Sequence, residues 1–176
     1  EQQVIIPRKG VLELQRLMTG DGELNIELGQ NHIRIQLGEI RFTSKLIDGR
    51  FPEYDRVIPK ESSNKLKADR GEFKSALQRT AILSNEKYRG IRLVIRDSGV
   101  FLQAHNSEQE EAEEELAVEY NGEDIEIGFN VNYLLDALSA IEGDDVVLSI
   151  QDSNSSCLMR QPGSEDCTFV VMPMRL

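Results

Sequence analysis

The chain has 176 residues, which is enough for one domain, or for one domain with part of another. Its hydrophobic content of 39% suits a globular protein, and no apolar run approaches the length of a membrane span. The net charge of −11 argues against a general affinity for nucleic acid, because phosphates repel an acidic surface, but it does not exclude a local basic strip.

Neither the start of the chain nor its cysteines indicate a secreted protein. Glu1 is not an initiator methionine and no basic leader with an apolar core follows it, so we expect a boundary within a longer protein or a processed end. Cys157 and Cys167 are ten residues apart, which matches no metal-binding motif. A disulfide between them is an alternative, but two reduced thiols in a cytoplasmic protein are the better interpretation.

One pattern occurs three times along the chain: a strand, a short amphipathic helix, and two or three further strands. In the first copy, β-branched residues 4–6 predict a strand, and Pro7 is well placed in the first turn of a helix. This helix has apolar residues at helical spacing: Val11, Leu14, Leu17 and Met18. Gly20 and Gly22 end it, and alternating apolar residues then predict strands over 24–28, 33–37 and 40–46.

The second and third copies follow the same order. The second has a helical stripe at Phe73, Ala76, Leu77 and Ala81, and strands are predicted over 91–95, 100–104 and 115–120. The third opens with a strand over 125–127 and with Asn130 as a plausible N-cap. Its helical stripe is Val131, Leu134, Leu138 and Ile141, and strands are predicted over 146–150, 156–159 and 168–171. The helices open near residues 9, 72 and 130, so the repeat is loose, and a unit of this kind is expected to need a neighbour.

A linker separates the first copy from the other two. Residues 48–59 contain two prolines and a glycine, and residues 60–64 are polar, so we divide the chain into residues 1–59 and 60–176. One unit precedes the boundary and two follow it. If a domain needs two units, the first is half of a domain.

No stretch of the chain carries a catalytic or nucleotide-binding motif. Six glutamates lie within residues 108–115, but consecutive acids on a loop and a strand diverge, so a solvated acidic edge is a better interpretation than a metal or acid–base site. An ionic contact with a basic partner is a third interpretation. His32 and His105 lack metal spacing, and Ser153–Ser156 lacks the setting of a nucleophile elbow. We therefore expect no enzyme, no metal and no cofactor.

Charge and apolar residues single out the helices and the chain end. The first two helices carry more base than acid, which is typical of an ordinary polar face but also fits a basic strip, because residues 122–176 hold ten acidic residues and only two basic ones. The chain ends on large apolar residues, Val170–Met174. They predict either a last strand within a sheet or the wall of an apolar groove, for which methionine is suited and to which Phe51, Pro52 and Val57 could add.

Four stretches resemble the beta subunit of bacterial DNA polymerase III, the sliding clamp, and the match covers the whole chain in order. They are FTSKLIDGRFPEY (residues 42–54), AILSNEKYRG (81–90), EIGFNVNY (126–133) and MPMRL (172–176). The resemblance implies an α+β DNA-clamp fold of repeated β-α-β-β-β units, with antiparallel sheets outside and helices on one face. It also implies that residues 1–59 are the second half of the middle domain with the interdomain linker, and that residues 60–176 are the C-terminal domain.

The resemblance also implies three sets of site residues. The peptide-binding set is Pro52, Arg56, Val57, Asn130, Tyr133, Ser156, Val170, Met172, Pro173, Met174 and Arg175. The subunit interface is formed by Ile82 and Leu83 with an acidic rim of Glu108, Glu110, Glu111, Glu113 and Glu114. The DNA-facing set is Arg8, Lys9, Arg16 and Arg56.

The expected function is that of a processivity factor without catalysis of its own. Such a clamp encircles duplex DNA as a homodimer, with contacts directed at phosphates and blind to sequence, and binds short peptides of replicative and other polymerases, the clamp loader and repair proteins. A peptide-binding adaptor that never touches DNA is the main rival. A metal-dependent hydrolase that uses the glutamates is a third class, which would require binding of divalent ions.

Overall fold

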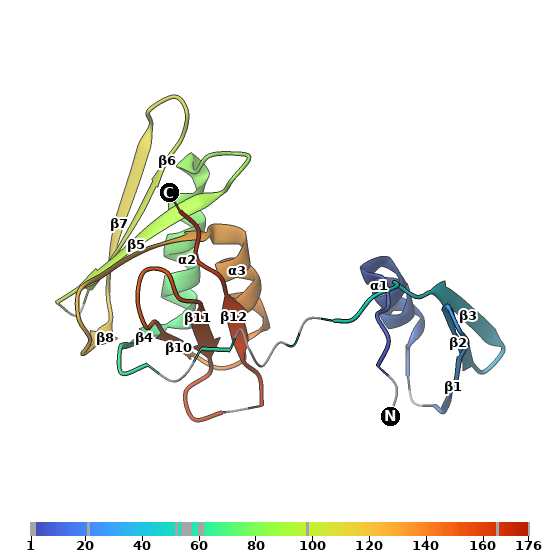
Figure 1. Ribbon diagram of the computed structural model, residues 1–176. Coiled ribbons are helices and arrows are strands. Elements are labelled where there is room, and N and C mark those ends of the chain that lie inside the picture. Colours follow the sequence, from blue (N-terminus) through green and yellow to red (C-terminus); the bar gives the residue numbers. More distant parts are fainter. Residues whose placement is uncertain are drawn as a thin grey trace. The chain divides into compact units, whose positions relative to one another are not determined.

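The chain forms two compact units, residues 1–53 and residues 54–176, each with its own hydrophobic core (Figure 1). The computed structural model describes residues 3–20, 22–51, 53, 58–59, 62–97, 99–164 and 166–175. We call residues 1–53 the N-terminal unit and residues 54–176 the C-terminal body.

The described residues of the N-terminal unit form one helix beside a three-stranded sheet. Its elements are α1 (Arg8–Leu17), β1 (Leu24–Leu28), β2 (His32–Leu37) and β3 (Ile40–Lys45). The strands are antiparallel in the order β1-β2-β3, and the core between sheet and helix contains Ile33, Ile35 and Leu46. No residue of α1 is buried. This small core leaves much apolar surface of the unit uncovered.

The strand predicted over residues 4–6 is reduced to one bridge. Ile5 pairs with Ile47 in an isolated antiparallel bridge, and the Ile47 N–H donates to the Ile5 carbonyl at 2.9 Å. A ladder needs successive bridges, and among the described residues the segment has a neighbour at this position alone. Pro7, predicted in the first helical turn, is the N-cap of α1.

The described residues of the C-terminal body form two α-helices, one 3-10 helix and two antiparallel sheets. Its elements are β4 (Lys65–Asp69), α2 (Arg70–Thr80), the 3-10 helix η2 (Ala81–Leu83), β5 (Gly90–Arg96), β6 (Gly99–His105), β7 (Glu111–Ala117), β8 (Glu119–Tyr120), β9 (Ile125–Asn130), α3 (Val131–Ala140), β10 (Asp145–Ser149), β11 (Cys157–Arg160) and β12 (Phe169–Val171). The sheet orders are β12-β11-β10-β4-β8 and β7-β6-β5-β9.

The two copies of the repeat exchange their leading strands. β4 immediately precedes α2 but pairs with β10 of the other copy, and β9 immediately precedes α3 but pairs with β5. Apart from β8, each sheet therefore consists of three strands from one copy and one strand from the other. This exchange joins the copies into one domain.

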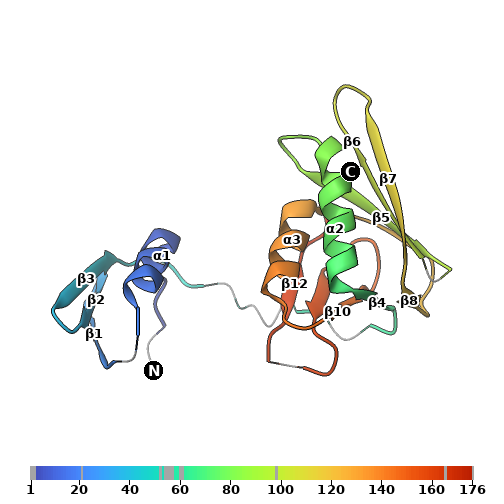
Figure 2. The same ribbon diagram turned by 180° about the vertical axis from the view of Figure 1, so that it is seen from behind.

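Both helices pack against the sheets and against each other, and they run side by side in both views (Figures 1 and 2). Phe73 of α2 and Leu134 of α3 are fully buried in the shared core. Each helix begins at a capping side chain: Asp69 accepts the N–H of Glu72 at 2.7 Å, and Asn130 accepts the N–H of Asn132 at 3.0 Å. The predicted antiparallel α+β architecture and the predicted cap at Asn130 are confirmed.

Two further strands differ from the sequence prediction. β4 was not predicted, because it alternates only Leu66 and Ala68 between polar residues and directly follows a polar linker. The strand predicted over residues 115–120 begins earlier, at Glu111, and is split into β7 and β8. Hydrogen bonds to the neighbouring strand β6 hold the glutamates in β7, although glutamate has a low strand propensity.

Candidate binding surfaces

The chain end lies along the edge of the second sheet. β12 is the edge strand of the first sheet, and beyond it the N–H of Met174 donates to the carbonyl of Gly128 in β9 at 2.8 Å. Met172 is 59% exposed, while Pro173 and Met174 are half-buried and Arg175 is exposed. The predicted last strand is confirmed as Phe169–Val171. The residues after it present apolar surface, and the groove wall stays a prediction.

A tight loop lies beside this segment. Asp152 accepts the N–H groups of Asn154 and Ser155, both at 2.8 Å, and the hydroxyl of Ser155 at 2.9 Å. These hydrogen bonds, the one from the Asn154 N–H first, lower the pKa of Asp152. Because Cys157 pairs with Val171, Ser156 lies at the same end of the strand pair as Met172. Ser156 is buried and Val170 is half-buried.

The start of α3 supplies the other polar residues predicted for the peptide site. Asn130 caps the helix and its Nδ2 donates to the carbonyl of Tyr88 at 3.2 Å, so both polar atoms of its side chain hold local structure. Tyr133 is 60% exposed on the first turn. α3 also contacts β12. Residues 130–133 and the chain end therefore belong to one body, whereas Pro52, Arg56 and Val57 lie outside the described residues.

A cavity of about 500 Å³ lies beside the chain end and is lined in part by residues that were not predicted for the peptide site. Met174 and Arg175 line it together with Tyr88 and His105. Tyr88 is 56% exposed. Tyr88 follows η2 and lies in the stretch 81–90 that resembles the beta subunit, and this resemblance was the only sequence signal for it. Nothing in the sequence spacing pointed to His105.

Four of the seven residues predicted for a subunit interface come together around a second cavity, of about 430 Å³. Ile82 and Leu83 line it with Glu108 and Glu110. Ile82 is 76% exposed, the largest exposure of any large apolar side chain among the described residues. An exposed apolar side chain beside an acidic loop is the combination that the predicted interface with a basic partner requires.

Asn106 organises this acidic loop. Its side-chain oxygen accepts the N–H groups of Glu108 and Glu110, each at 3.0 Å, and its Nδ2 donates to the Glu110 carboxylate at 2.7 Å. Asn106 was not among the residues predicted from the sequence, although an asparagine at the start of a polar loop is a known turn signal.

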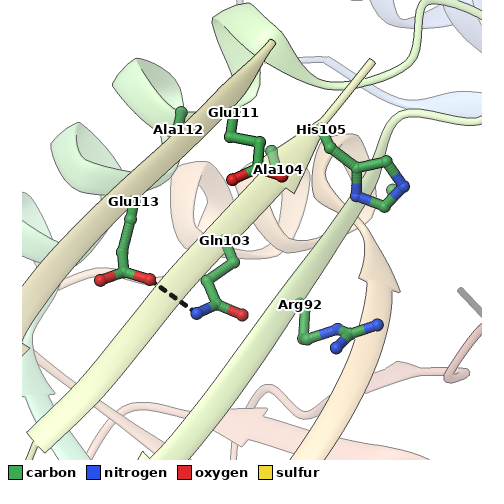
Figure 3. Close-up of a pocket in the computed structure, with 8 residues that line it drawn as sticks. Arg92, Gln103, Ala104, His105, Glu111, Ala112 and Glu113 are labelled. Carbon is green, nitrogen blue, oxygen red and sulfur yellow. Dashed lines mark hydrogen bonds between the residues drawn. The ribbon is translucent and has the colours of Figure 1, made fainter. Parts of the chain in front are cut away.

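Strand alternation divides the remaining glutamates between two faces. Glu111 and Glu113 are exposed on the face of the sheet away from the helices, and with Gln103 and Arg92 they line a cavity of about 240 Å³. Figure 3 shows these side chains on neighbouring strands of the sheet. Gln103 donates to Glu113 at 2.6 Å. Glu114 points to the opposite face, as the period of two requires.

Glu114 forms an ion pair within the chain. The guanidinium of Arg79, in the last turn of α2, donates two hydrogen bonds to its carboxylate, at 2.5 and 2.6 Å. This contact lowers the pKa of Glu114. Of the five glutamates predicted for the rim, Glu114 is thus already paired with a base of its own chain, and the pair ties α2 to the edge strand β7.

Three of the four predicted DNA-facing residues lie on α1. Arg8 and Lys9 are exposed in its first turn, and Arg16 forms an ion pair with Glu13 at 2.9 Å. Arg56 lies outside the described residues. In the C-terminal body, Arg70 is committed to structure, because it donates to the carbonyls of Gly143 and Leu138 at the end of α3.

Among the described residues, no group of three or more His, Cys, Asp or Glu side chains could hold a metal ion. No helix in the described part of the chain is long and apolar enough to span a membrane.

Family models match both units. Residues 55–175 match the model described as DNA polymerase III beta subunit, C-terminal domain, and residues 1–53 match the model of the central domain of the same subunit.

Individual relatives agree with the family models. The chain is 57% identical over 175 residues to the beta sliding clamp of Pseudomonas aeruginosa, and 49% identical over 174 residues to that of Escherichia coli K12. These alignments cover 99% and 98% of the chain but 48% of each relative. The chain therefore spans about half the length of the curated relatives it matches.

Solved structures are similar over the same extent. The DNA polymerase III subunit beta of P. aeruginosa matches with a TM-score of 0.93 at 56% identity, over 99% of this chain and 48% of that one. The Caulobacter crescentus pol III beta matches with a TM-score of 0.90 at 38% identity, over 98% and 47%. A further P. aeruginosa clamp, with a TM-score of 0.90 at 56% identity over 99% and 48%, is bound to griselimycin. The expected fold is confirmed.

Proposed function

Because the chain belongs to the family of the DNA polymerase III beta subunit, we propose that it is part of a sliding clamp that tethers a polymerase to duplex DNA. Residues 1–59 would be the second half of the central domain with the interdomain linker, and residues 60–176 the C-terminal domain. In the full-length protein, two subunits would close head to tail around DNA in the bacterial cytoplasm. The clamp would act by binding, without a reaction of its own.

The observation that carries this proposal is the apolar chain end held against the C-terminal body. The bond from Met174 to Gly128 fixes its backbone, while Met172 is left 59% exposed and Tyr133, on the first turn of α3 in the same body, is 60% exposed. Val170, Pro173 and Arg175 complete this side of a peptide groove, and Asn130 and Ser156 would border it. Pro52, Arg56 and Val57 would supply the linker side.

Such a groove suits short linear peptides of polymerases, the clamp loader and repair proteins. One or two buried apolar anchors would each contribute roughly 1.5–3 kcal/mol, and part of this is lost to ordering of the peptide. We therefore expect affinities of about micromolar. Arg175 offers a fork of donors for a carboxylate or a carbonyl of the peptide.

The experiment is titration of a labelled polymerase tail peptide against full-length clamp. Deletion of Met172–Leu176 should abolish binding and leave the ring dimeric. Met172→Ala should weaken binding by about tenfold or more, because an apolar contact is lost, whereas Met172→Leu, which keeps the volume, should bind nearly as wild type. Unchanged affinity after the deletion would mean that the chain end is only a sheet edge.

The subunit interface is proposed for Ile82 and Leu83, with Glu108, Glu110, Glu111 and Glu113 as its exposed rim. Glu114 would have to share its carboxylate between Arg79 and a partner. In full-length protein, the double change Ile82→Ala with Leu83→Ala should give monomers, through a loss of roughly 2–5 kcal/mol per site. Sedimentation velocity measures this, and a ring that stays dimeric at micromolar concentration would contradict the assignment.

DNA binding distinguishes the clamp from a peptide-binding adaptor. The DNA-facing residues would be Arg8, Lys9, Arg16 and Arg56, and their contacts would be with phosphates. Association of the full-length ring with duplex DNA should therefore weaken as salt is raised and should not depend on sequence. An adaptor would bind the same peptides and show no association with DNA at any salt concentration.

A further inference from the structure

The cavity of about 500 Å³ that Met174 and Arg175 line differs in charge from the body around it. Residues 54–176 contain thirteen basic and twenty-three acidic residues, yet no described residue that lines this cavity is an Asp or a Glu. Arg175 is exposed and forms no ion pair with any described residue. His105 adds a ring N–H donor. The cavity is therefore a local positive site on an acidic body.

The glutamates of the neighbouring loop belong to other surfaces. Asn106 holds this loop: its side-chain oxygen accepts the N–H groups of Glu108 and Glu110, and its Nδ2 donates to the Glu110 carboxylate at 2.7 Å. Glu108 and Glu110 line the cavity beside Ile82, which shares Asn106 with this one as a common wall. Glu111 lines the cavity on the outer face of the sheet. Acid thus lies beyond the wall, and Arg175 lies on this side of it.

Tyr88 forms an aromatic wall whose backbone is fixed. Its N–H donates to Oδ1 of Asn85 at 3.1 Å, and its carbonyl accepts Nδ2 of Asn130 at 3.2 Å. Its side chain is 56% exposed, and Nζ of Lys87 lies 5.2 Å from the centre of its ring, which brings a second positive charge close by. A ligand that contacts Tyr88 therefore meets a preorganised wall and pays little for ordering the protein.

The cavity is continuous with the surface proposed to bind peptides. Met174 lines the cavity, and its backbone is fixed by the bond to Gly128. Met172, which is 59% exposed, precedes it by two residues, so their Cα atoms are at most about 7 Å apart. All described lining residues lie within residues 55–175, which match the C-terminal domain of the family. A peptide anchored at Met172 therefore reaches the cavity with the residues next to its anchors.

We propose that this cavity is a subsite for an acidic residue that flanks the apolar anchors of the bound peptide, an inference that rests on the proposed peptide function. The guanidinium of Arg175 binds the carboxylate, since its planar fork of donors matches two carboxylate oxygens. The aliphatic part of the acidic side chain packs on Met174 and Tyr88. The subsite thus ranks peptides that share the same anchors by the charge of their flank.

Two features distinguish this subsite from general electrostatics. The acidic excess of the body repels an acidic peptide at long range, so a preference for acid has the opposite sign to the field of the whole body. In addition, the cavity adjoins Met174 on one side of Met172, so a single flank of the peptide reaches it. Selectivity for acid at one flank alone is therefore expected.

The first test is titration of full-length clamp with labelled polymerase tail peptides that differ beside the anchors. Two residues are Glu-Glu or Gln-Gln, at the amino-terminal flank in one pair of peptides and at the carboxyl-terminal flank in another. At one flank, the Glu peptide should bind about three- to fivefold tighter at low salt, and about 0.5 M salt should remove most of this preference. At the other flank, it should bind equally or more weakly.

The outcomes separate the subsite from the groove. If all peptides bind but Glu is preferred at neither flank, or equally at both, the subsite is overturned while the groove stands. If none of the peptides binds, the groove is overturned and the subsite with it.

Variants then locate the preference. Arg175→Gln should bring the affinity ratio of the Glu and Gln peptides to about one, and His105→Glu should make the Glu peptide the weaker binder. The control Arg96→Gln also removes a positive charge, but six residues along β5 from Gly90, about 20 Å away. The control Ser139→Glu adds an acid in the last turn of α3. Both controls should keep the ratio. A ratio that survives both cavity variants, or that is lost with either control, overturns the proposal.

Discussion

The N-terminal unit and the C-terminal body are built from the same sequence of elements but differ in how far they are closed. In the body, two units exchange leading strands, and their helices and sheets enclose a single core. In the unit, three of the described residues are buried, and α1 contributes none of them. The comparison indicates that one copy of the repeat forms its helix and its sheet from its own local sequence. An enclosed core, as in the body, needs the helix and the sheet of a second copy.

The largest expected effect tests this difference at equivalent helical positions. Phe73→Ala should lower the free energy of unfolding of the C-terminal body by about 3–5 kcal/mol, because it leaves a cavity in a close-packed core. Val11→Ala, at the same position of α1, should cost less than about 1 kcal/mol, because the side chain is already half exposed. Urea denaturation of the chain measures both changes.

Leu134→Ala is the matched check within the body, and about 2–5 kcal/mol is expected there. If Val11→Ala proved as costly as Phe73→Ala, α1 would be covered in solution and the contrast between the two regions would fail.

The sequence predicted the repeat well, because its signals are local. The apolar stripes of three helices, the hairpins that follow them and the cap at Asn130 depend on residues a few positions apart, and the structure confirms them. The exchange of β4 and β9 could not be predicted in this way. Nothing within Lys65–Asp69 shows that its partner is β10, some eighty residues away.

For the candidate sites too, the sequence predicted which residues belong together but not their long-range contacts. Resemblance to the family pointed to Ile82, Leu83 and the glutamates together, and the structure brings Ile82 and Leu83 into one cavity with Glu108 and Glu110. The pairing of Glu114 with Arg79 was not foreseen, because the acidic run was treated as a loop and the start of a strand. Because β7 begins at Glu111, strand alternation places Glu114 on the face towards the helices, where Arg79 of α2 packs against it.

A smaller effect concerns how the helices begin. The two helices of the body start at side chains that accept an N–H, whereas α1 starts at Pro7 without such a bond. Asp69→Ala should therefore lower the free energy of unfolding of the body by about 1 kcal/mol, through loss of the bond from Glu72. Asp69→Ser keeps an acceptor and should recover most of the loss. Equal stability of all three proteins in denaturant titrations would mean that the cap contributes nothing.

The smallest effect, and the most specific, is the pH dependence of the pair that ties α2 to the edge of the sheet. Arg79 lowers the pKa of Glu114 in the folded body, so the pair stabilises the fold above the ordinary carboxyl pKa of about 4.5 and loses this contribution as the pH falls below it. Glu114→Gln cannot titrate at this position. The wild type should therefore be more stable than the variant near pH 7, and the difference should shrink as the pH is lowered towards 3.

Glu113→Gln is the matched control, since Glu113 lies on the opposite face of the same strand and accepts a hydrogen bond from neutral Gln103. Its stability relative to wild type should change little over the same range. High salt should also reduce the Glu114 effect at pH 7, because the pair is partly exposed and screened. Thermal melts from pH 3 to 7 measure all three proteins. A difference for Glu114→Gln that stays constant with pH would show that the carboxylate contributes only packing, and that the edge of the body is held by its strand ladder alone.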